Sequence, residues 1–387
     1  MIDWKKWKKP LLKTASYVLV AALASAVTLL AFGPKSVKLD RLLRYIDRRY
    51  IGQVDMAAVE DAAAQAIVDA IGDRWSYYIS AEEYAEYQSG KDNTFVGIGI
   101  TIQARDDAMG FSVLSVEPDS PAQQAGLLPG DILVEADGQA LAGMNVYQVT
   151  DLIKGEEGTE VSVAVIRNGQ KHTFSVTRKK LQRAVAESRM LEGNVGYVKI
   201  NNFNTRCADE TIKAVNELVE QGAEALVFDV RNNGGGYLSE MVEVLDYLLP
   251  KGELVHTEHY TGSKDTDKSD AGCVELPMAV LINPDSYSAA ELFAAALREY
   301  DWAVLVGEPT TGKGYYQNTL MLGDGSAVAL SVGKYFTGEG VSLAEAGGLT
   351  PDVAVSVDEQ TAAMIYAGLL TPEEDPQLQA AIEALKS

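Results

Sequence analysis

The stretch Pro277-Met-Ala-Val-Leu-Ile-Asn-Pro-Asp-Ser-Tyr-Ser288-Ala-Ala-Glu-Leu-Phe293 joins two different hydrophobic patterns. It starts as a continuous apolar run of strand length, and alanine and leucine then recur at helical spacing from Ala289 to Tyr300. The pattern therefore places Ser288 at the corner between a buried strand and a helix. Because the first N–H groups of a helix lack partners within it and attract negative charge, this serine is a candidate nucleophile beside an oxyanion site.

Downstream, Gly312-Lys313-Gly314-Tyr-Tyr-Gln317 places a lysine in a turn framed by glycines. A lysine can act as general base for a serine only when it is neutral, which requires burial that lowers its pKa. If a strand follows, period-two alternation puts Lys313 and Gln317 on one face, where Gln317 could orient the amine. The two segments together predict a serine/lysine hydrolase.

Each half of this pair has another interpretation. Ser288-Ala-Ala-Glu291 fits a capping box, in which the serine only satisfies helix N–H groups, unless Asp285 or Ser286 caps the helix instead. Lys313 closes the first seven positions of a phosphate-binding loop that begins at Gly307. That loop would need serine or threonine at its eighth position and a helix after it, whereas this chain has Gly314 and a strand-like run.

These segments, with Phe228-Asp-Val-Arg-Asn-Asn-Gly-Gly-Gly236, resemble the carboxy-terminal processing (tail-specific) serine peptidases. Gly348-Leu-Thr-Pro-Asp352 and the helix-like Asp375-Pro-Gln-Leu agree, so the resemblance covers nearly everything after the first 33 residues. It implies a crotonase-like ββα-spiral protease core within a multidomain α/β and β chain.

Carried over residue by residue, the resemblance makes Ser288 the nucleophile, Lys313 the general base and Gln317 the residue that positions the base. The oxyanion hole would comprise the amide of Ala289 and that of Gly234 or Gly235. From the residues alone, the glycine run is a strand-ending turn, and such a turn can also expose N–H groups to an anion.

Two segments depart from the family pattern. Gly234 stands where the family usually has proline, and a glycine there is expected to loosen the oxyanion turn. Asp73-Arg-Trp-Ser-Tyr-Tyr78 stands where the family has Asp-Pro-x-Ser-x-Tyr. Neither departure changes the expected dyad.

A second unit, from Asn93 to about Lys180, alternates short β-rich runs with turns. Ser120-Pro-Ala-Gln-Gln-Ala-Gly126-Leu-Leu-Pro-Gly-Asp131 makes it resemble a circularly permuted PDZ domain. Its carboxylate-binding loop, the residues that would accept a peptide C-terminus, would comprise Val96, Gly97, Ile98, Gly99 and Ile100, although a plain hairpin edge explains them too. Arg167 resembles a residue that couples the PDZ domain to the active site in some relatives, or is a solvated hairpin arginine.

We expect four regions: residues 1–33 as a cytoplasmic stub and anchor, 34–92 helical, 93–180 the PDZ domain, and 181–387 the protease core with a C-terminal helical tail. Lysines precede the uncharged run from Ala15 to Phe32, which predicts one transmembrane helix with a cytoplasmic N-terminus and an extracytoplasmic catalytic part. A cleaved signal peptide is the alternative. Helical spacing is expected between Asp40 and Ile79.

The remaining composition limits the partners. Without residues 1–14 the chain has 28 basic and 54 acidic residues, so nucleic acid is not an expected partner. No metal site or cofactor is expected. Cys207 and Cys273 are more plausibly thiols than a disulfide, and His256 and His259 are assigned to a surface loop.

The sequence thus predicts an extracytoplasmic, membrane-anchored serine endopeptidase that acts on proteins or peptides recognised through their free C-termini. A homodimer and a regulatory protein partner are also expected, from the resemblance and from the amphipathic helices. The alternative is a PDZ scaffold at the membrane whose catalytic part is silent or is activated by a partner.

Overall fold

The computed structural model describes residues 37–105 and 109–386, in two units that divide between Arg74 and Trp75. In the first unit, α2 (Val37–Arg49) and α3 (Met56–Asp69) confirm the expected helices. Asp55 begins α3 by accepting the N–H groups of the first turn. The predicted anchor, from Ala15 to Phe32, lies outside the described residues. Among the residues that are described, no helix is both long enough and apolar enough to cross a bilayer.

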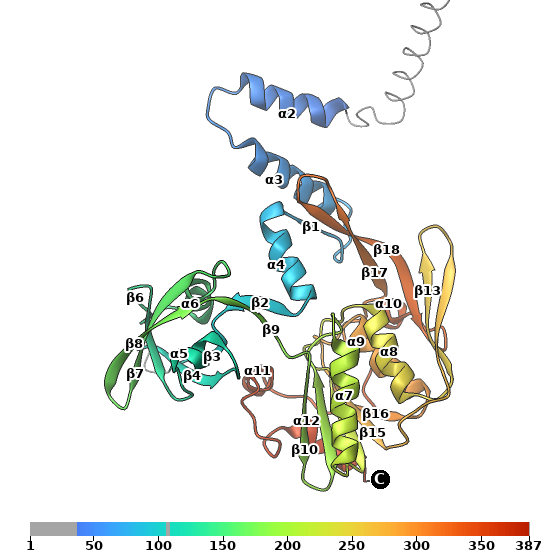
Figure 1. The fold of residues 1–387 in the computed structure, drawn as a ribbon. Coiled ribbons are helices and arrows are strands. Elements are labelled where there is room, and N and C mark those ends of the chain that lie inside the picture. The colour runs from blue at the N-terminus through green and yellow to red at the C-terminus, as the bar shows by residue number, and fades with distance from the viewer. Residues whose placement is uncertain (1–36, 106–108, 387) are drawn as a thin grey trace, which may run out of the picture. The chain divides into compact units, whose positions relative to one another are not determined.

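The protease core of the second unit is built on a six-stranded sheet with the order β10-β11-β12-β15-β16-β19 (Figure 1). Only β10 is antiparallel to its neighbour, and the other pairs are parallel. Every residue of the two central strands, β12 and β15, is buried, as expected for parallel strands that are covered on both sides. The strands are β10 (Ala186–Leu191), β11 (Val195–Ile200), β12 (Ala225–Asp229), β15 (Met278–Ile282), β16 (Ala303–Gly307) and β19 (Val353–Ala354).

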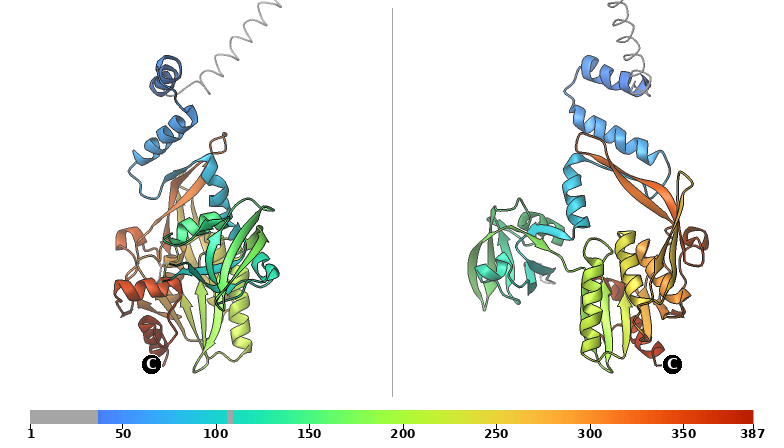
Figure 2. Two further views of the ribbon diagram at one scale, coloured as in Figure 1. Left: turned by 90° about the vertical axis from the view of Figure 1, so that its left-hand side faces the viewer. Right: turned by 45° about the vertical axis from the view of Figure 1, so that its right-hand side comes forward.

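Helices cover the two faces of this sheet (Figure 2). One face packs against α7 (Cys207–Glu220), α8 (Leu238–Leu248) and α9 (Ala289–Glu299), whose apolar side chains form the largest core. The other face packs against α12 (Pro376–Ala384), which contributes Leu378 and Ala381. The helix expected from Ala289 to Tyr300 and the expected C-terminal helix are thus confirmed, and the parallel strands all end on the same edge of the sheet.

A second sheet has the order β1-β18-β13-β14, with β17 also paired to β18. It corrects two expectations. The end of the predicted N-terminal helical region is strand β1 (Tyr77–Ile79), which pairs with β18 (Ala327–Thr337). The segment that contains His256 and His259, expected to be a surface loop, is strand β13 (Gly252–His259), and it pairs with the polar strand β14 (Lys264–Ser269). The side chains of β14 are mostly exposed on both faces, so backbone pairing forms a strand that hydrophobic periodicity could not reveal.

The PDZ-like unit has its own six-stranded sheet and its own core (Figure 1). Helix α6 (Val146–Ile153) and strand β4 (Phe111–Val116) contribute to this core. The remaining elements are β3 (Ile100–Ala104), α5 (Pro121–Ala125), β5 (Ile132–Ala136), β6 (Gln139–Ala140), β7 (Glu160–Arg167) and β8 (Gln170–Thr177).

Shorter elements connect these parts. Strands β2 (Thr94–Gly97) and β9 (Lys179–Gln182) pair with each other at the two ends of the PDZ-like unit. Helix α4 (Ala81–Lys91) precedes β2 and begins with a capping box made by Ser80 and Glu83. The other elements are β17 (Tyr315–Met321), α10 (Leu343–Ala346) and α11 (Glu359–Ala367).

Candidate active site

Ser288 lies at the corner between β15 and α9, as the sequence predicted. Its backbone has φ 61° and ψ −124°. This conformation is unfavourable for any residue other than glycine, and such strained residues cluster at functional sites. Neither of the alternative caps replaces it. Ser286 is buried and donates to the Val230 carbonyl at 2.8 Å, and α9 begins directly after Ser288. The corner therefore holds a strained serine at the N-terminus of a buried helix.

Glu291 connects this corner to the lysine turn. Its Oε2 accepts the N–H of Ser288 at 3.0 Å and that of Lys313 at 2.9 Å. Its Oε1 accepts the Gly312 N–H at 2.7 Å and the Thr310 hydroxyl at 2.5 Å. Burial raises the pKa of this carboxyl, and the four donors oppose that shift. The capping-box glutamate thus also fixes the loop that carries the candidate base.

Lys313 lies in the loop between β16 and β17. Gly312 adopts φ 79°, and a Cβ there would come within 2.6 Å of the Gly348 nitrogen. Gly314 likewise leaves no room for a side chain, because its Cβ would come within 2.7 Å of the Ala344 Cβ. The glycine frame therefore allows close backbone packing, as expected. A strand follows the lysine, so the helix that a phosphate-binding loop needs is absent and that interpretation is wrong.

Tyr335 joins the two halves from β18. Its buried hydroxyl donates to the Lys313 carbonyl, and the Ser288 side chain is near enough to influence its pKa. Burial raises the pKa of this phenol well above its ordinary value. The tyrosine therefore stays protonated and remains a hydrogen-bond donor at the candidate site.

Gln317 lies on β17, but the expected alternation from Lys313 is interrupted. Lys313 precedes the strand, and a register shift falls between Tyr316 and Gln317. The Gln317 side-chain nitrogen donates to the Ser331 hydroxyl at 3.0 Å and to the Tyr315 carbonyl at 3.1 Å. Its role as the residue that orients the base stays a prediction.

The glycine run packs directly on the candidate nucleophile. A Cβ on Gly235 would lie 2.8 Å from the Ser288 Cβ and 2.9 Å from the Ala289 nitrogen. The Gly235 N–H itself donates to the Asn233 side chain at 2.8 Å, within the turn. Among the described residues no hydrogen bond involves the Gly234 N–H. Of the two glycine amides considered for the oxyanion hole, the geometry favours Gly234, together with Ala289.

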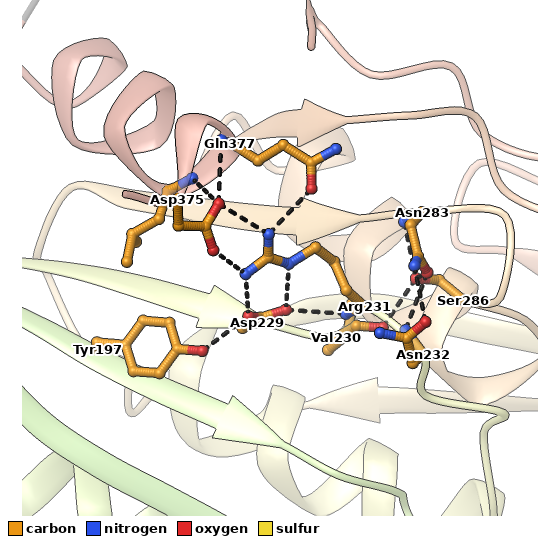
Figure 3. Close-up of polar contacts among 10 residues, drawn as sticks. Tyr197, Asp229, Val230, Arg231, Asn232, Asn283, Ser286, Asp375 and Gln377 are labelled. Atoms are coloured by element: carbon orange, nitrogen blue, oxygen red, sulfur yellow. Dashed lines mark hydrogen bonds and ion pairs between the residues drawn. The ribbon is translucent and has the colours of Figure 1, made fainter. Parts of the chain in front are cut away.

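A buried ion-pair cluster fixes the strand that leads into this turn (Figure 3). Arg231 pairs through two nitrogens with Asp229, at 3.0 and 2.6 Å, and through two with Asp375, at 3.1 and 2.7 Å. Gln377 accepts from the same guanidinium at 2.9 Å, and Tyr197 donates to Asp229 at 2.7 Å. Burial alone would raise the pKa of Asp229, but Arg231 outweighs it and lowers that pKa. The C-terminal helix is thus bound to the end of β12.

The PDZ-like unit contains a cavity of about 320 Å³. Gly97, Ile98, Gly99 and Ile100 of the predicted carboxylate-binding loop line it, whereas Val96 is not among its lining residues. The opposite wall comes from α6 and includes Thr150 and Ile153. The cavity thus lies between a strand edge and a helix, as in domains that add a peptide as an extra strand.

Arg167 forms an ion pair within the PDZ-like unit. Its guanidinium bonds both carboxylate oxygens of Asp131 at 2.6 Å and the Gly126 carbonyl at 2.8 Å. Asp131 is buried, which by itself raises its pKa, and the arginine bonds lower that pKa below its usual value. Arg167 is therefore a structural ion pair in this conformation, and a coupling role stays a prediction.

The histidines and cysteines have other surroundings. His256 is hydrogen-bonded to Thr266 and to the Gly338 carbonyl, and His259 is hydrogen-bonded to Thr261. Both cysteines are free thiols, and burial raises the pKa of Cys207 to about 12. A thiol with that pKa is not ionised near neutral pH, so Cys207 is a packing residue.

Sequence reasoning missed several residues at this site. Tyr335 and Thr310 lie in segments whose local pattern predicts only a strand and a loop, so no signal pointed to them. Trp75 and Tyr287 were noticed only as parts of longer segments, and both rings lie near Lys313. Glu291 had a signal, its position three residues after the serine, but the capping box explained only one of its bonds.

Two family models match parts of this chain. Residues 194–355 match the model of peptidase family S41, and residues 112–167 match a PDZ domain model. Carboxy-terminal processing protease CtpA from Bacillus subtilis is 30% identical over 361 residues, 88% of this chain and 76% of that protein. The chloroplastic C-terminal processing peptidase of Tetradesmus obliquus is 31% identical, over 80% of this chain and 74% of that protein.

A crystal structure of a Bacteroides fragilis protein named as an S41 protease shares the fold. It has a TM-score of 0.58 and 18% sequence identity, and the match covers 91% of this chain and 97% of that one. Together with the curated relatives, these matches place the chain in peptidase family S41, as a serine-type peptidase of the carboxy-terminal processing group with a PDZ domain.

Proposed function

We propose that this peptidase cleaves protein chains whose free C-termini bind at the PDZ cavity, with Ser288 as nucleophile and Lys313 as general base. The observation that carries the proposal is that the backbone N–H groups of Ser288 and Lys313 both donate to Glu291. This side chain therefore holds the serine turn and the lysine turn together. The proposal includes an extracytoplasmic location, with the catalytic part anchored by the helix predicted from Ala15 to Phe32. It also includes a crotonase-like spiral core, a homodimer and a regulatory protein partner.

The reaction would proceed in two steps. The Ser288 hydroxyl attacks the scissile carbonyl carbon while Lys313 accepts its proton, and the resulting oxyanion is bound by the Ala289 and Gly234 N–H groups. The lysine then returns the proton to the leaving amine, which leaves an acyl group on Ser288. Water deacylates the serine with Lys313 again as base.

An unfolded protein substrate tests this function. The full-length chain in detergent and its Ser288→Ala and Lys313→Ala variants are incubated with the substrate, and fragments are followed by mass spectrometry. We expect cleavage by the parent alone, with all three proteins equally folded by circular dichroism. Equal cleavage by a variant would end the mechanism. Peptide binding without cleavage by the parent would favour the PDZ scaffold.

A further inference from the structure

Two aromatic rings face the candidate base. The Nζ of Lys313 lies 4.8 Å from the ring centre of Trp75 and 5.9 Å from that of Tyr287. The rings are 5.8 Å apart and inclined by 36° to each other. Trp75 comes from the segment just before β1, and Tyr287 directly precedes the serine. Both distances are within the range in which an ammonium group is attracted to an aromatic face.

Tyr287 also contacts the oxyanion turn. Its N–H donates to the Asn233 carbonyl at 3.2 Å, and a Cβ on Gly234 would lie 2.6 Å from its hydroxyl oxygen. The ring therefore spans the site, from the lysine on one side to Gly234 on the other. The two departures from the family pattern, Gly234 and the segment that contains Trp75, thus meet at one side chain.

We propose that Trp75 and Tyr287 are positioning residues that hold Lys313 and stabilise the ammonium formed when it takes the serine proton. This inference rests on the proposed serine/lysine mechanism. In that mechanism the lysine is neutral before the reaction and charged in the transition state. An aromatic face interacts more strongly with the charged form, so the rings favour the transition state over the ground state.

The test replaces the aromatic face while keeping apolar volume. Trp75→Leu removes the π system, and Trp75→Phe keeps a smaller one. We expect Trp75→Leu to lower kcat roughly two- to thirtyfold with KM nearly unchanged, and Trp75→Phe to keep most of the activity. Since the ammonium loses support, the lysine would give up its proton at lower pH, and the acidic limb of the kcat/KM profile should move to lower pH in Trp75→Leu.

Trp302→Leu is the matched control. This tryptophan packs on the main core and donates to the Val274 carbonyl at 3.1 Å. Its replacement should lower the melting temperature and leave the acidic limb in place. A purely structural role of Trp75 would give the same result as this control, which would overturn the proposal.

Other outcomes are equally decisive. An unchanged kcat in Trp75→Leu, or equal impairment in Trp75→Phe with no displaced limb, would overturn the aromatic role. If Trp75→Leu does not fold, Tyr287→Leu tests the same contact from the other ring. Ser288→Ala is assayed in parallel. If the parent is active and Ser288→Ala is inactive, the proposed function holds, and a negative result with Trp75 then counts only against the role of the two aromatic rings. If Ser288→Ala retains full activity, both the proposed function and the proposed role of Trp75 and Tyr287 are wrong.

Discussion

The backbone N–H groups of Ser288 and Lys313 donate to the same carboxylate oxygen, Oε2 of Glu291. The two residues are 25 positions apart in the sequence and belong to different loops. A single buried acceptor therefore sets the relative position of the candidate nucleophile and the candidate base. Productive geometry at such sites must be held within a few tenths of an ångström, so this bond is expected to matter for turnover more than for substrate binding.

Glu291→Gln should separate positioning from folding. The amide keeps the shape but loses the charge and one acceptor oxygen, so at least one buried N–H group is left without a partner, at a cost of about 1–3 kcal/mol. We expect a loss of that size in the free energy of unfolding and a fall in kcat of at least about tenfold, with KM little changed. Urea unfolding and steady-state kinetics measure the two effects.

Glu240 supplies the control for that variant. Its carboxylate also accepts two backbone N–H groups, those of Ala208 at 2.9 Å and Arg206 at 3.3 Å, at the start of α7. Glu240→Gln should lower stability while kcat is retained. If both variants lose the same small fraction of activity, Glu291 has only a structural role.

Asp375→Asn tests the link between the C-terminal helix and the glycine turn. Asparagine caps a helix as well as aspartate does, so the bonds to the Gln377 and Leu378 N–H groups should persist. The charge paired with Arg231 is lost, together with the bond that Oδ2 accepts from the guanidinium. Breaking a buried pair costs about 3–5 kcal/mol when a partner is removed, and the isosteric amide should cost somewhat less. Hydrogen exchange in α12 and in the Asn232–Gly236 turn should increase together.

Asp358→Asn is the matched comparison. Asp358 caps α11 through the Thr361 N–H at 2.7 Å, and its pKa is lowered by that bond. It has no arginine partner among the described residues, so its amide should leave the free energy of unfolding nearly unchanged. Exchange that increases in α12 but stays unchanged in the turn would contradict a coupling between the two.

The sequence was most informative where the chemistry is local. The change from a strand period to a helix period placed Ser288 at its corner, and the Gly-Lys-Gly frame predicted the close packing around Lys313. The glutamate bonds to Gly312 and Lys313 had no signal, because the partners are about 20 residues away and their contact depends on how the loops pack. The same reason hid Tyr335, which reaches the site from a different sheet.

Alternation of apolar and polar residues did not reveal the strands that are held mainly by backbone pairing. Strand β14 has exposed side chains on both faces, and β1 is too short to show alternation. The expected geometry of Gln317 failed for another reason: a register shift next to it changes which side chains share a face. Bulges of this kind follow from tertiary packing and cannot be read from the alternation of residue types.

Arg167→Gln should make the PDZ-like unit less stable at neutral pH. Asp131 is ionised and paired with Arg167, and its pKa is lowered, so the pair contributes stability above the ordinary aspartate value of about 3.9. That contribution is lost as the pH falls through the lowered value. The stability difference between parent and variant should therefore shrink below about pH 4. Denaturant unfolding at several pH values, monitored by hydrogen exchange in β5 and β7, measures it.

The same variant distinguishes a structural from a coupling role for Arg167. If the arginine only stabilises its unit, cleavage should respond to a C-terminal PDZ-binding peptide equally in parent and variant. A changed response at a temperature where both proteins are folded would support coupling. Lys171→Gln is the control, because its ion pair with Glu135 in the same unit is largely exposed.

Gly234→Ala and Gly235→Ala should have different effects on stability. An alanine at Gly235 would need φ 86° and would bring its Cβ to 2.8 Å from the Ser288 Cβ, against backbone that cannot move away. We expect a loss of about 1–3 kcal/mol in stability together with loss of activity.

At Gly234 the nearest atom is the Tyr287 hydroxyl oxygen, at 2.6 Å, which is the end of a side chain. Gly234→Ala should fold normally and lose turnover, because it displaces the ring beside Lys313. Adding Tyr287→Phe removes the nearest clashing atom but keeps the ring carbon Cζ at 2.8 Å, so it should restore part of the kcat. No recovery in the double variant would show that the alanine acts on the turn itself.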